Sequence, residues 1–124
     1  MKPVKIIRAE AFDLMQYFYG SAHDPLIHCR IRFSSHLDEA ALKRAVTLSQ
    51  QAVPLLRCRF NAAARRPRWE ECGFSEADIV RVSEGNDADA ERLLASTIDI
   101  AREPQLKLFL IRGESADTLC AMIN

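Results

Sequence analysis

Three histidines and four cysteines are the side chains in this sequence best suited to metal binding or nucleophilic catalysis. His28 and Cys29 are adjacent, and His23 and His36 lie close by in the sequence. A metal site needs several converging ligands, and structural zinc sites usually have paired Cys or His at short spacing. Neighbouring residues in a strand point to opposite faces, so His28 and Cys29 are poorly placed to share one ion. We therefore predict no metal site here, and expect buried thiols and a surface imidazole instead.

The cysteines are also weighed as nucleophiles, which need a reactive and partly exposed thiolate beside a base. Cys29 and Cys58 fall on apolar faces of expected strands, and Cys120 lies in the most apolar strand. Core packing is the better interpretation of these three thiols. Cys72 borders a loop and is left unassigned.

Several other patterns have simple interpretations. Glu70 and Glu71 are adjacent in an expected strand and would point to opposite faces, which favours a solvated edge over a catalytic pair. There is no glycine-rich phosphate loop and no GxSxG motif. Two clusters remain. We interpret the aromatic cluster as core packing: Phe12, Tyr17, Phe18 and Tyr19. We interpret the basic cluster as a solvated loop: Arg65, Arg66 and Arg68.

The elements that would position these side chains follow from periodicity and breakers. In the strand over 26–33, Ile27, Cys29 and Ile31 would face the core. Asp38 is a good N-cap for a helix that Pro54 ends, and Leu37 and Leu42 stand at the positions of a hydrophobic staple. The other expected helices are 13–19 and 88–101, and the other expected strands are 4–11, 55–60, 68–72, 79–82, 105–111 and 119–123.

The last strand, Leu119–Ile123, is apolar on both faces. Such a strand belongs inside a sheet that helices cover, so the pattern predicts an α/β fold with a mixed sheet flanked by helices. No later element of this sequence could complete that cover. We therefore expect self-association, as a dimer or larger homo-oligomer, through Gln105–Ile111 or Leu119–Ile123.

Composition narrows the function classes. The 124 residues suit one small domain, and 17 basic against 17 acidic residues give no net charge, which argues against nucleic-acid binding. No apolar run is long enough to span a membrane, and Arg8 and Glu10 interrupt the only apolar start, so we expect no signal peptide. Cysteines without a CxxC pair are typical of reduced thiols, and we expect a cytoplasmic protein.

The order of four segments resembles the N-terminal portion of the chloramphenicol-acetyltransferase-like superfamily. That superfamily includes the condensation domains of nonribosomal peptide synthetases and stand-alone acyltransferases. A "Leu-Asp…Ala-Leu…Ala" helix precedes a "Pro-x-Leu-Arg" strand, and a "Pro-x-Leu-x-Leu" strand and an apolar strand follow. The matching segments cover nearly the whole chain: Leu37–Ala45, Val53–Phe60, Glu103–Ile111 and Asp117–Asn124.

The resemblance implies one incomplete domain over residues 1–124, the N-terminal half of an acyltransferase-like α/β sandwich. In the family the apolar strand runs into His-His-x-x-x-Asp-Gly, whose second histidine is the general base. This sequence stops at Asn124, where that motif would begin, and His23, His28 and His36 do not match it. We therefore predict no catalytic residue in this chain and no bound cofactor, and leave cofactor-binding residues open.

The implied parent protein transfers an acyl group from a CoA or carrier-protein (phosphopantetheine) thioester to an alcohol or amine. Its C-terminal half would be the partner of this chain, and the chain alone would be inactive. The stretch Phe12–Tyr17 departs from the Leu-(Ser/Thr)-x-x-Gln segment of carrier-dependent condensation domains, which favours a stand-alone acyltransferase. The alternative is a non-catalytic module that dimerises or binds a partner.

Overall fold

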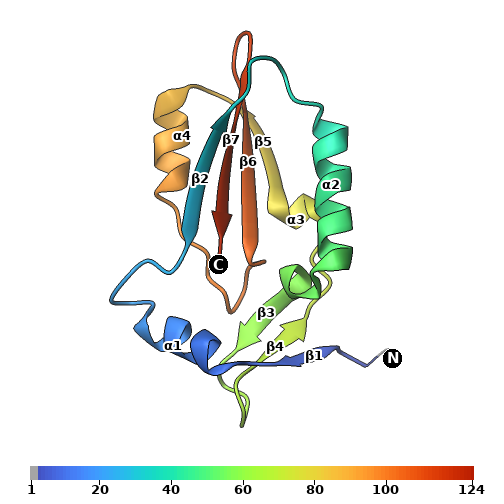
Figure 1. Cartoon of the computed structure of the whole chain (residues 1–124), viewed down its shortest axis with the longest axis vertical. Coiled ribbons are helices and arrows are strands. Elements are labelled where there is room, and N and C mark those ends of the chain that lie inside the picture. Colours follow the sequence, from blue (N-terminus) through green and yellow to red (C-terminus); the bar gives the residue numbers. More distant parts are fainter. Residues whose placement is uncertain (1–2) are drawn as a thin grey trace.

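The computed structural model describes residues 3–124, which fold into two β-sheets with helices packed around them (Figure 1). The larger sheet has the strand order β2 (Ile27–Arg32), β7 (Asp117–Ile123), β6 (Leu106–Arg112) and β5 (Val80–Glu84). β5 and β6 are parallel, and the other neighbours are antiparallel. The predicted mixed sheet is therefore confirmed, and the doubly apolar strand is one of its two inner strands.

The smaller sheet is antiparallel and was not expected as a separate unit. Its strand order is β1 (Ile6–Arg8), β4 (Arg68–Glu71) and β3 (Cys58–Asn61). Cys58, Phe60 and Trp69 form its buried core. Helix α1 (Ala11–Tyr19) lies against this core through Leu14 and Tyr17, whose ring centroid is 5.0 Å from that of Phe60.

Helix α2 (Glu39–Ala52) begins and ends where the sequence predicts. The Asp38 carboxylate accepts a hydrogen bond from the Ala41 amide at 3.2 Å, so the N-cap is confirmed. Leu37 and Leu42 both pack on the core of the larger sheet, as a hydrophobic staple requires. Pro54 opens a 3-10 helix, η1 (Pro54–Arg57), directly after α2.

The two faces of the larger sheet pack against different helices. On one face, Val46 of α2 packs with Val80, Leu108 and Leu110 of the sheet. On the other face, Ala90 of α4 (Asp87–Leu94) packs with buried side chains of β6 and β7. The sheet is therefore covered on both sides, although α2 lies over β5 and β6 and not over β2.

Some predicted boundaries were wrong. The helix predicted over 88–101 ends at Leu94, because Ser96 donates from both its amide and its hydroxyl to the Leu93 carbonyl and the chain then turns. The strand predicted over 55–60 begins only at Cys58, since proline-led η1 takes its first residues. A short helix, α3 (Glu76–Ile79), takes the first residue of the strand predicted over 79–82.

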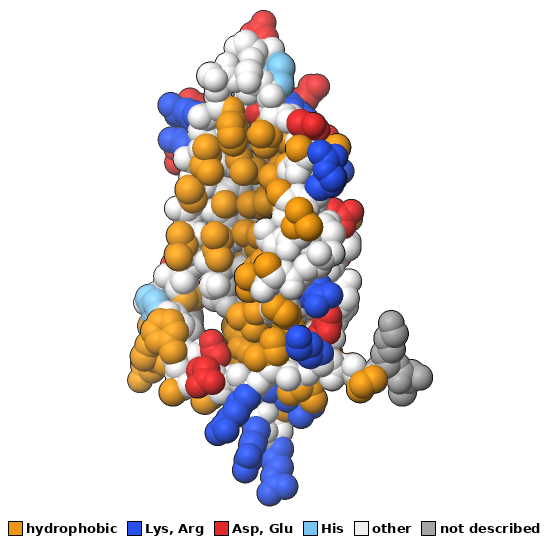
Figure 2. All heavy atoms as spheres, turned by 45° about the vertical axis from the view of Figure 1, so that its right-hand side comes forward, with side chains coloured by type: hydrophobic (Ala, Val, Ile, Leu, Met, Phe, Trp, Pro, Cys, Tyr) orange, Lys and Arg blue, Asp and Glu red, His pale blue; other side chains and the backbone are white. Residues whose placement is uncertain are grey.

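The apolar side of β2 was predicted to face the core, and this was wrong. Ile27 is 64% exposed and Ile31 is 42% exposed, and Cys29 is exposed as well. β2 is an edge strand of the sheet, and no helix among residues 3–124 lies over this side of it. Figure 2 shows the consequence, a broad group of hydrophobic side chains on one face of the larger sheet.

Within residues 3–124, no helix is both long and apolar enough to cross a membrane.

Candidate functional site

The carboxyl end of β7 opens on a pocket with a volume of about 470 Å³. The end of α1, the loop that follows it, the loop after α4 and Asn124 form its walls. Polar side chains from all of these segments line it, among them Gln16, His23, Asp24, Thr97, Asp99 and Asn124. The pocket therefore lies beside Asn124, directly after the end of β7.

Two histidines lie at or near this pocket and both have polar partners. His23 Nε2 is 3.3 Å from the side-chain oxygen of Gln16. His28 Nε2 is 2.5 Å from Asp24 Oδ2. The Leu26 amide and then His28 hold the pKa of the Asp24 carboxyl below its usual value. Asp24 therefore stabilises the loop between α1 and β2, because its carboxylate binds the Leu26 amide within the loop and the His28 side chain near the start of β2.

Gln105 fixes the position of Asn124. It is only 1% exposed, and its side-chain oxygen accepts a hydrogen bond from Asn124 Nδ2 at 2.7 Å. Its side-chain nitrogen donates to the Cys58 carbonyl of β3 at 3.2 Å, and lies 3.3 Å from the Glu103 carbonyl. One buried amide thus joins the two sheets and holds the last residue of the chain at the pocket. Sequence reasoning missed Gln105; the signal was a lone amide at the start of an apolar strand.

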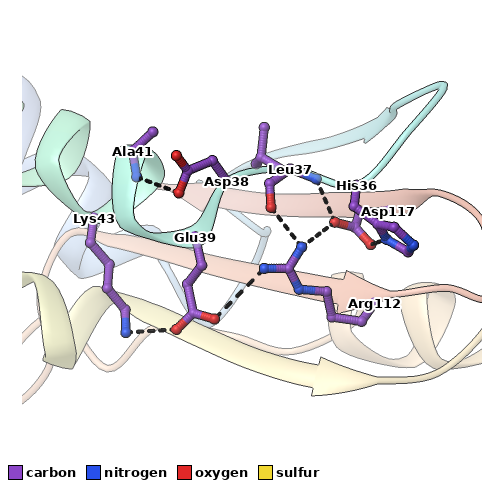
Figure 3. A network of polar contacts seen from close by, with 8 residues as sticks. All are labelled: His36, Leu37, Asp38, Glu39, Ala41, Lys43, Arg112 and Asp117. Carbon is purple, nitrogen blue, oxygen red and sulfur yellow. Dashed lines mark hydrogen bonds and ion pairs between the residues drawn. The ribbon is translucent and has the colours of Figure 1, made fainter.

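The opposite end of β7 carries a second polar cluster, which Figure 3 shows from close by. Asp117 is 1% exposed and accepts hydrogen bonds from His36 Nδ1 at 2.8 Å and from the Leu37 amide at 2.6 Å. Arg112 Nη1 lies 2.6 Å from Asp117 and donates to the Leu37 carbonyl at 2.6 Å. Arg112 also faces Glu39 at 3.7 Å. This cluster ties the start of α2 to β6 and β7.

The cluster keeps a buried carboxylate ionised. Burial alone would raise the pKa of Asp117, but the hydrogen bonds from His36, Leu37 and Arg112 lower it to about 2. His36 lies near His28 and Cys29 in the sequence, but in the structure its partner is the Asp117 carboxylate. Among the described residues there is no group of three or more His, Cys, Asp or Glu side chains that could hold a metal ion.

The cysteine predictions are partly confirmed. Cys58 and Cys120 are buried, and burial raises the pKa of both thiols. Cys29 was expected in the core but is exposed, because α2 does not reach over β2. Cys72, which the sequence pattern does not place, is also exposed.

The remaining candidates are the two adjacent glutamates, the basic cluster and the N-terminal aromatic residues. Glu70 and Glu71 take different partners: Asn61 and Arg68 lower the pKa of Glu70, and Arg57 lies 3.2 Å from Glu71. Arg65 and Arg66 are exposed in the loop between β3 and β4, as predicted. Arg68 was predicted in the same loop, but it begins β4 and pairs with Glu70 at 2.9 Å. The prediction that the aromatic residues pack in the core was wrong for Phe12, Phe18 and Tyr19, which are 62%, 67% and 60% exposed. Tyr17 packs against Phe60 but is still 37% exposed.

Searches by sequence find nothing: no family model matches the chain, and no curated protein matches it. Comparison with solved structures does find relatives in fold. The tallysomycin biosynthesis protein TlmII superposes with a TM-score of 0.74 at 19% identity, over 97% of this chain and 33% of that one. The X-domain from teicoplanin biosynthesis gives 0.75 at 16% identity, over 100% and 28%.

A third solved structure is the first condensation domain of the calcium-dependent antibiotic synthetase, in complex with a substrate analogue. It gives a TM-score of 0.70 at 15% identity, over 96% of this chain and 32% of that one. The fold class is thus a two-sheet α/β fold with flanking helices. More particularly, it is a partial condensation-domain fold, and the chain spans about a third of the length of the structures it matches.

Proposed function

We propose that this chain is the N-terminal part of an acyltransferase of the condensation type. The parent protein transfers an acyl group from a CoA or phosphopantetheine thioester to an alcohol or amine. The observation that carries the proposal is the superposition of nearly the whole chain on condensation domains, with a pocket at the end of β7. In the resembling family a catalytic histidine follows that strand, so the pocket is where acceptor and donor would meet.

In this proposal the described residues supply walls and supports and leave proton transfer to a histidine of the parent protein. Gln105 and Asn124 hold the end of β7 beside the pocket. Asp24 braces the loop that carries His23. A general base near neutral pH would take the acceptor's proton as its oxygen or nitrogen attacks the thioester carbonyl, and the thiol would leave. A cytoplasmic location also stays a prediction.

The test uses the longest protein that the gene encodes. We expect its sequence after Asn124 to contain a His and, about four residues later, an Asp, within about ten residues. Incubated with acetyl-CoA or with an acetyl-phosphopantetheine thioester, and with a panel of small alcohols and amines, it should release free thiol. Replacing the His that lies about four residues before this Asp with Ala should reduce the rate by about 10²–10⁴-fold. A gene that ends at Asn124, or a complete protein that transfers no acyl group from either thioester, would contradict the proposal.

The second candidate function is a non-catalytic module that dimerises. A separate observation favours it: Ile27, Cys29 and Ile31 of β2 and Ile123 of β7 are exposed on one face of the larger sheet. Monomeric proteins rarely leave large apolar patches exposed to water.

A further inference from the structure

One side of the edge strand β2 carries apolar side chains that no helix among residues 3–124 covers. Leu119 and Ala121 of the neighbouring β7 are already buried beneath α2. The exposed apolar surface is therefore about one strand wide, except at the end of β7, where the register places Ile123 opposite Ile27. We call this surface the β2 strip: Ile27, Cys29 and Ile31 of β2 with Ile123 of β7. It belongs to the face of the larger sheet on which Figure 2 shows hydrophobic side chains.

The flank of α2 that is turned toward β2 consists of small side chains. The opposite flank is turned toward α3, since Lys43 and Thr47 line a surface hollow together with Glu76. Helical spacing places four residues on the flank toward β2, which we call the small flank: Ala41, Ala45, Ser49 and Ala52. The Ser49 hydroxyl donates to the Ala45 carbonyl at 2.8 Å. A helix flank that faces water usually carries charged or long polar side chains. Here the small flank and the β2 strip instead form the two sides of one uncharged corner.

The spacing of this corner fits one further helix beside α2. α2 packs on side chains of β5, β6 and β7, so its axis is centred near β6, and Figure 1 shows it on the β5 side of the sheet. β2 lies two strands from β6, which is about 10 Å at the usual spacing of strands. Packed helices lie about 8–10 Å apart, depending on the side chains between them. A helix packed against the small flank is therefore centred over β2 and covers the β2 strip.

The helices of residues 3–124 are all placed elsewhere. α1 packs on the smaller sheet through Leu14 and Tyr17, and α4 packs on the other face of the larger sheet. The chain spans only 33% and 32% of two of the solved structures that it matches, so most of such a protein lies outside it. Ile123, which belongs to the β2 strip, directly precedes Asn124. A segment that follows Asn124 therefore starts at one end of the corner between α2 and β2.

We propose that the segment following Asn124 in the parent protein forms an amphipathic helix that lies in this corner, against the small flank and the β2 strip. The inference rests on the proposed function, in which the chain is the N-terminal part of a longer protein. α2 begins beside Asp117, at the other end of β7, so a helix that starts near Asn124 runs antiparallel to α2.

The length of the corner sets the length of this helix. From Ile27 to Ile31, β2 advances about 13.5 Å, which corresponds to about nine helical residues, and α2 itself has 14 residues. We therefore expect a helix of about 9–14 residues, with an apolar stripe toward Ile27 and Ile31 and polar side chains toward water. Because longer connections are uncommon in compact domains, it should begin within about 15 residues of Asn124.

A segment of the same chain is a better occupant of the corner than a second copy. A segment joined to β7 by a short connection has an effective concentration of about a millimolar, which a second copy does not reach in dilute solution. The self-association predicted through Gln105–Ile111 or Leu119–Ile123 has no free strand edge to use. β6 and β7 are inner strands, and both edges of each are already hydrogen-bonded.

Labelling of Cys29 tests whether the corner is filled. In the longest protein that the gene encodes, maleimide modification of the peptide that contains Cys29 is followed in native buffer and in urea. We expect the native rate to be lower by about tenfold or more, because a helix over the β2 strip shields this thiol. Ala45→Glu on the small flank should remove most of that protection, and Thr47→Glu on the opposite flank is the matched control and should keep it. Modification of Cys29 as fast in native buffer as in urea would overturn the inference.

Disulfide trapping shows which segment covers Cys29. In a Cys72→Ser background of the same protein, each residue of the first helix that the sequence predicts after Asn124 is replaced by cysteine in turn, and the protein is oxidised mildly. Positions on the apolar side of that helix should form an intramolecular disulfide with Cys29, and Cys29→Ser should abolish it. Positions on its polar side are the controls and should form none.

Two results of the trapping would overturn the inference. One is a disulfide from Cys29 to a second molecule, and the other is a protected Cys29 that forms no disulfide with this helix. Neither measurement depends on acyl transfer. An inactive protein in which the disulfide forms would therefore contradict the proposed function alone, and an active protein in which it does not form would contradict this inference alone.

Discussion

At the scale of single residues, two buried polar side chains hold the ends of β7. Gln105 joins the smaller sheet to the pocket end of β7, and Asp117 joins α2 to its other end. Buried polar groups destabilise a fold unless they are hydrogen-bonded, so each is useful only because its partners are in place. Neither residue was singled out from the sequence, because an isolated Gln or Asp gives no sign of which distant carbonyl or arginine it will meet.

The first prediction concerns Gln105. Gln105→Met keeps the size of the side chain but leaves the buried Cys58 carbonyl without its donor and removes the acceptor of the Asn124 side-chain amide. We expect the free energy of unfolding in urea to fall by about 1–3 kcal/mol, the cost of unsatisfied buried groups. Gln51→Met, on the exposed side of α2, is the control and should change it little. Equal effects of the two substitutions would mean that Gln105 does not join the sheets.

The second prediction concerns pH and Asp117. Its pKa is about 2 in the folded chain against an ordinary value of 3.8, so the unfolded state binds the proton more readily. The stability that Asp117 contributes is therefore present above pH 3.8 and is lost as the pH falls towards 2. Asp117→Asn should lower the free energy of unfolding most at neutral pH, and its difference from wild type should shrink between pH 3.8 and 2.

The exposed Glu84→Gln serves as the control for Asp117, and should give a small difference with no such trend. If the difference between Asp117→Asn and wild type stays constant across the acid range, then its carboxylate is not held ionised by His36, Leu37 and Arg112.

At the scale of elements, α2 was predictable because all of its signals are local. Asp38, the staple leucines and Pro54 act within a few residues of the helix ends, and its bounds match the expectation. The end of α4 was not predictable in this way. Ala101 continues the apolar spacing, yet Ser96 turns the chain at Leu93, and Ile98 is buried from a loop instead of from a helix.

The third prediction concerns the N-cap of α2. Asp38→Ala removes the acceptor of the Ala41 amide, and we expect the free energy of unfolding to fall by about 1 kcal/mol. Asp38→Asn keeps an acceptor at the same position and should recover most of that loss. Chemical denaturation followed by circular dichroism measures both. If Asn is as destabilising as Ala, the charge of Asp38 matters and not its capping hydrogen bond.

At the scale of the whole molecule, the order of elements carried more information than any single motif. The mixed sheet was predicted from the doubly apolar strand, and the fold from the order of four segments. The division into two sheets and the exposure of β2 were not predictable, because alternation shows that a strand has an apolar side but not what covers that side. The pocket was also hidden, since its walls come from segments about a hundred residues apart.

The last prediction is that this chain, by itself, does not catalyse acyl transfer. A base must lie within hydrogen-bonding reach of the acceptor, and positioned proton transfer contributes about 10²–10⁴-fold to such reactions. His36 is bound to Asp117 at the end of β7 away from the pocket, and His28 is bound to Asp24. His23 lines the pocket but lies against Gln16 and matches no catalytic motif.

We therefore expect thiol release from acetyl-CoA, with small alcohols or amines as acceptors, to be no faster with the chain than in buffer. His23→Ala, His28→Ala and His36→Ala should leave that background unchanged. Turnover above background that any one of the three substitutions abolishes would show that the chain has a catalytic site of its own, and would identify its base.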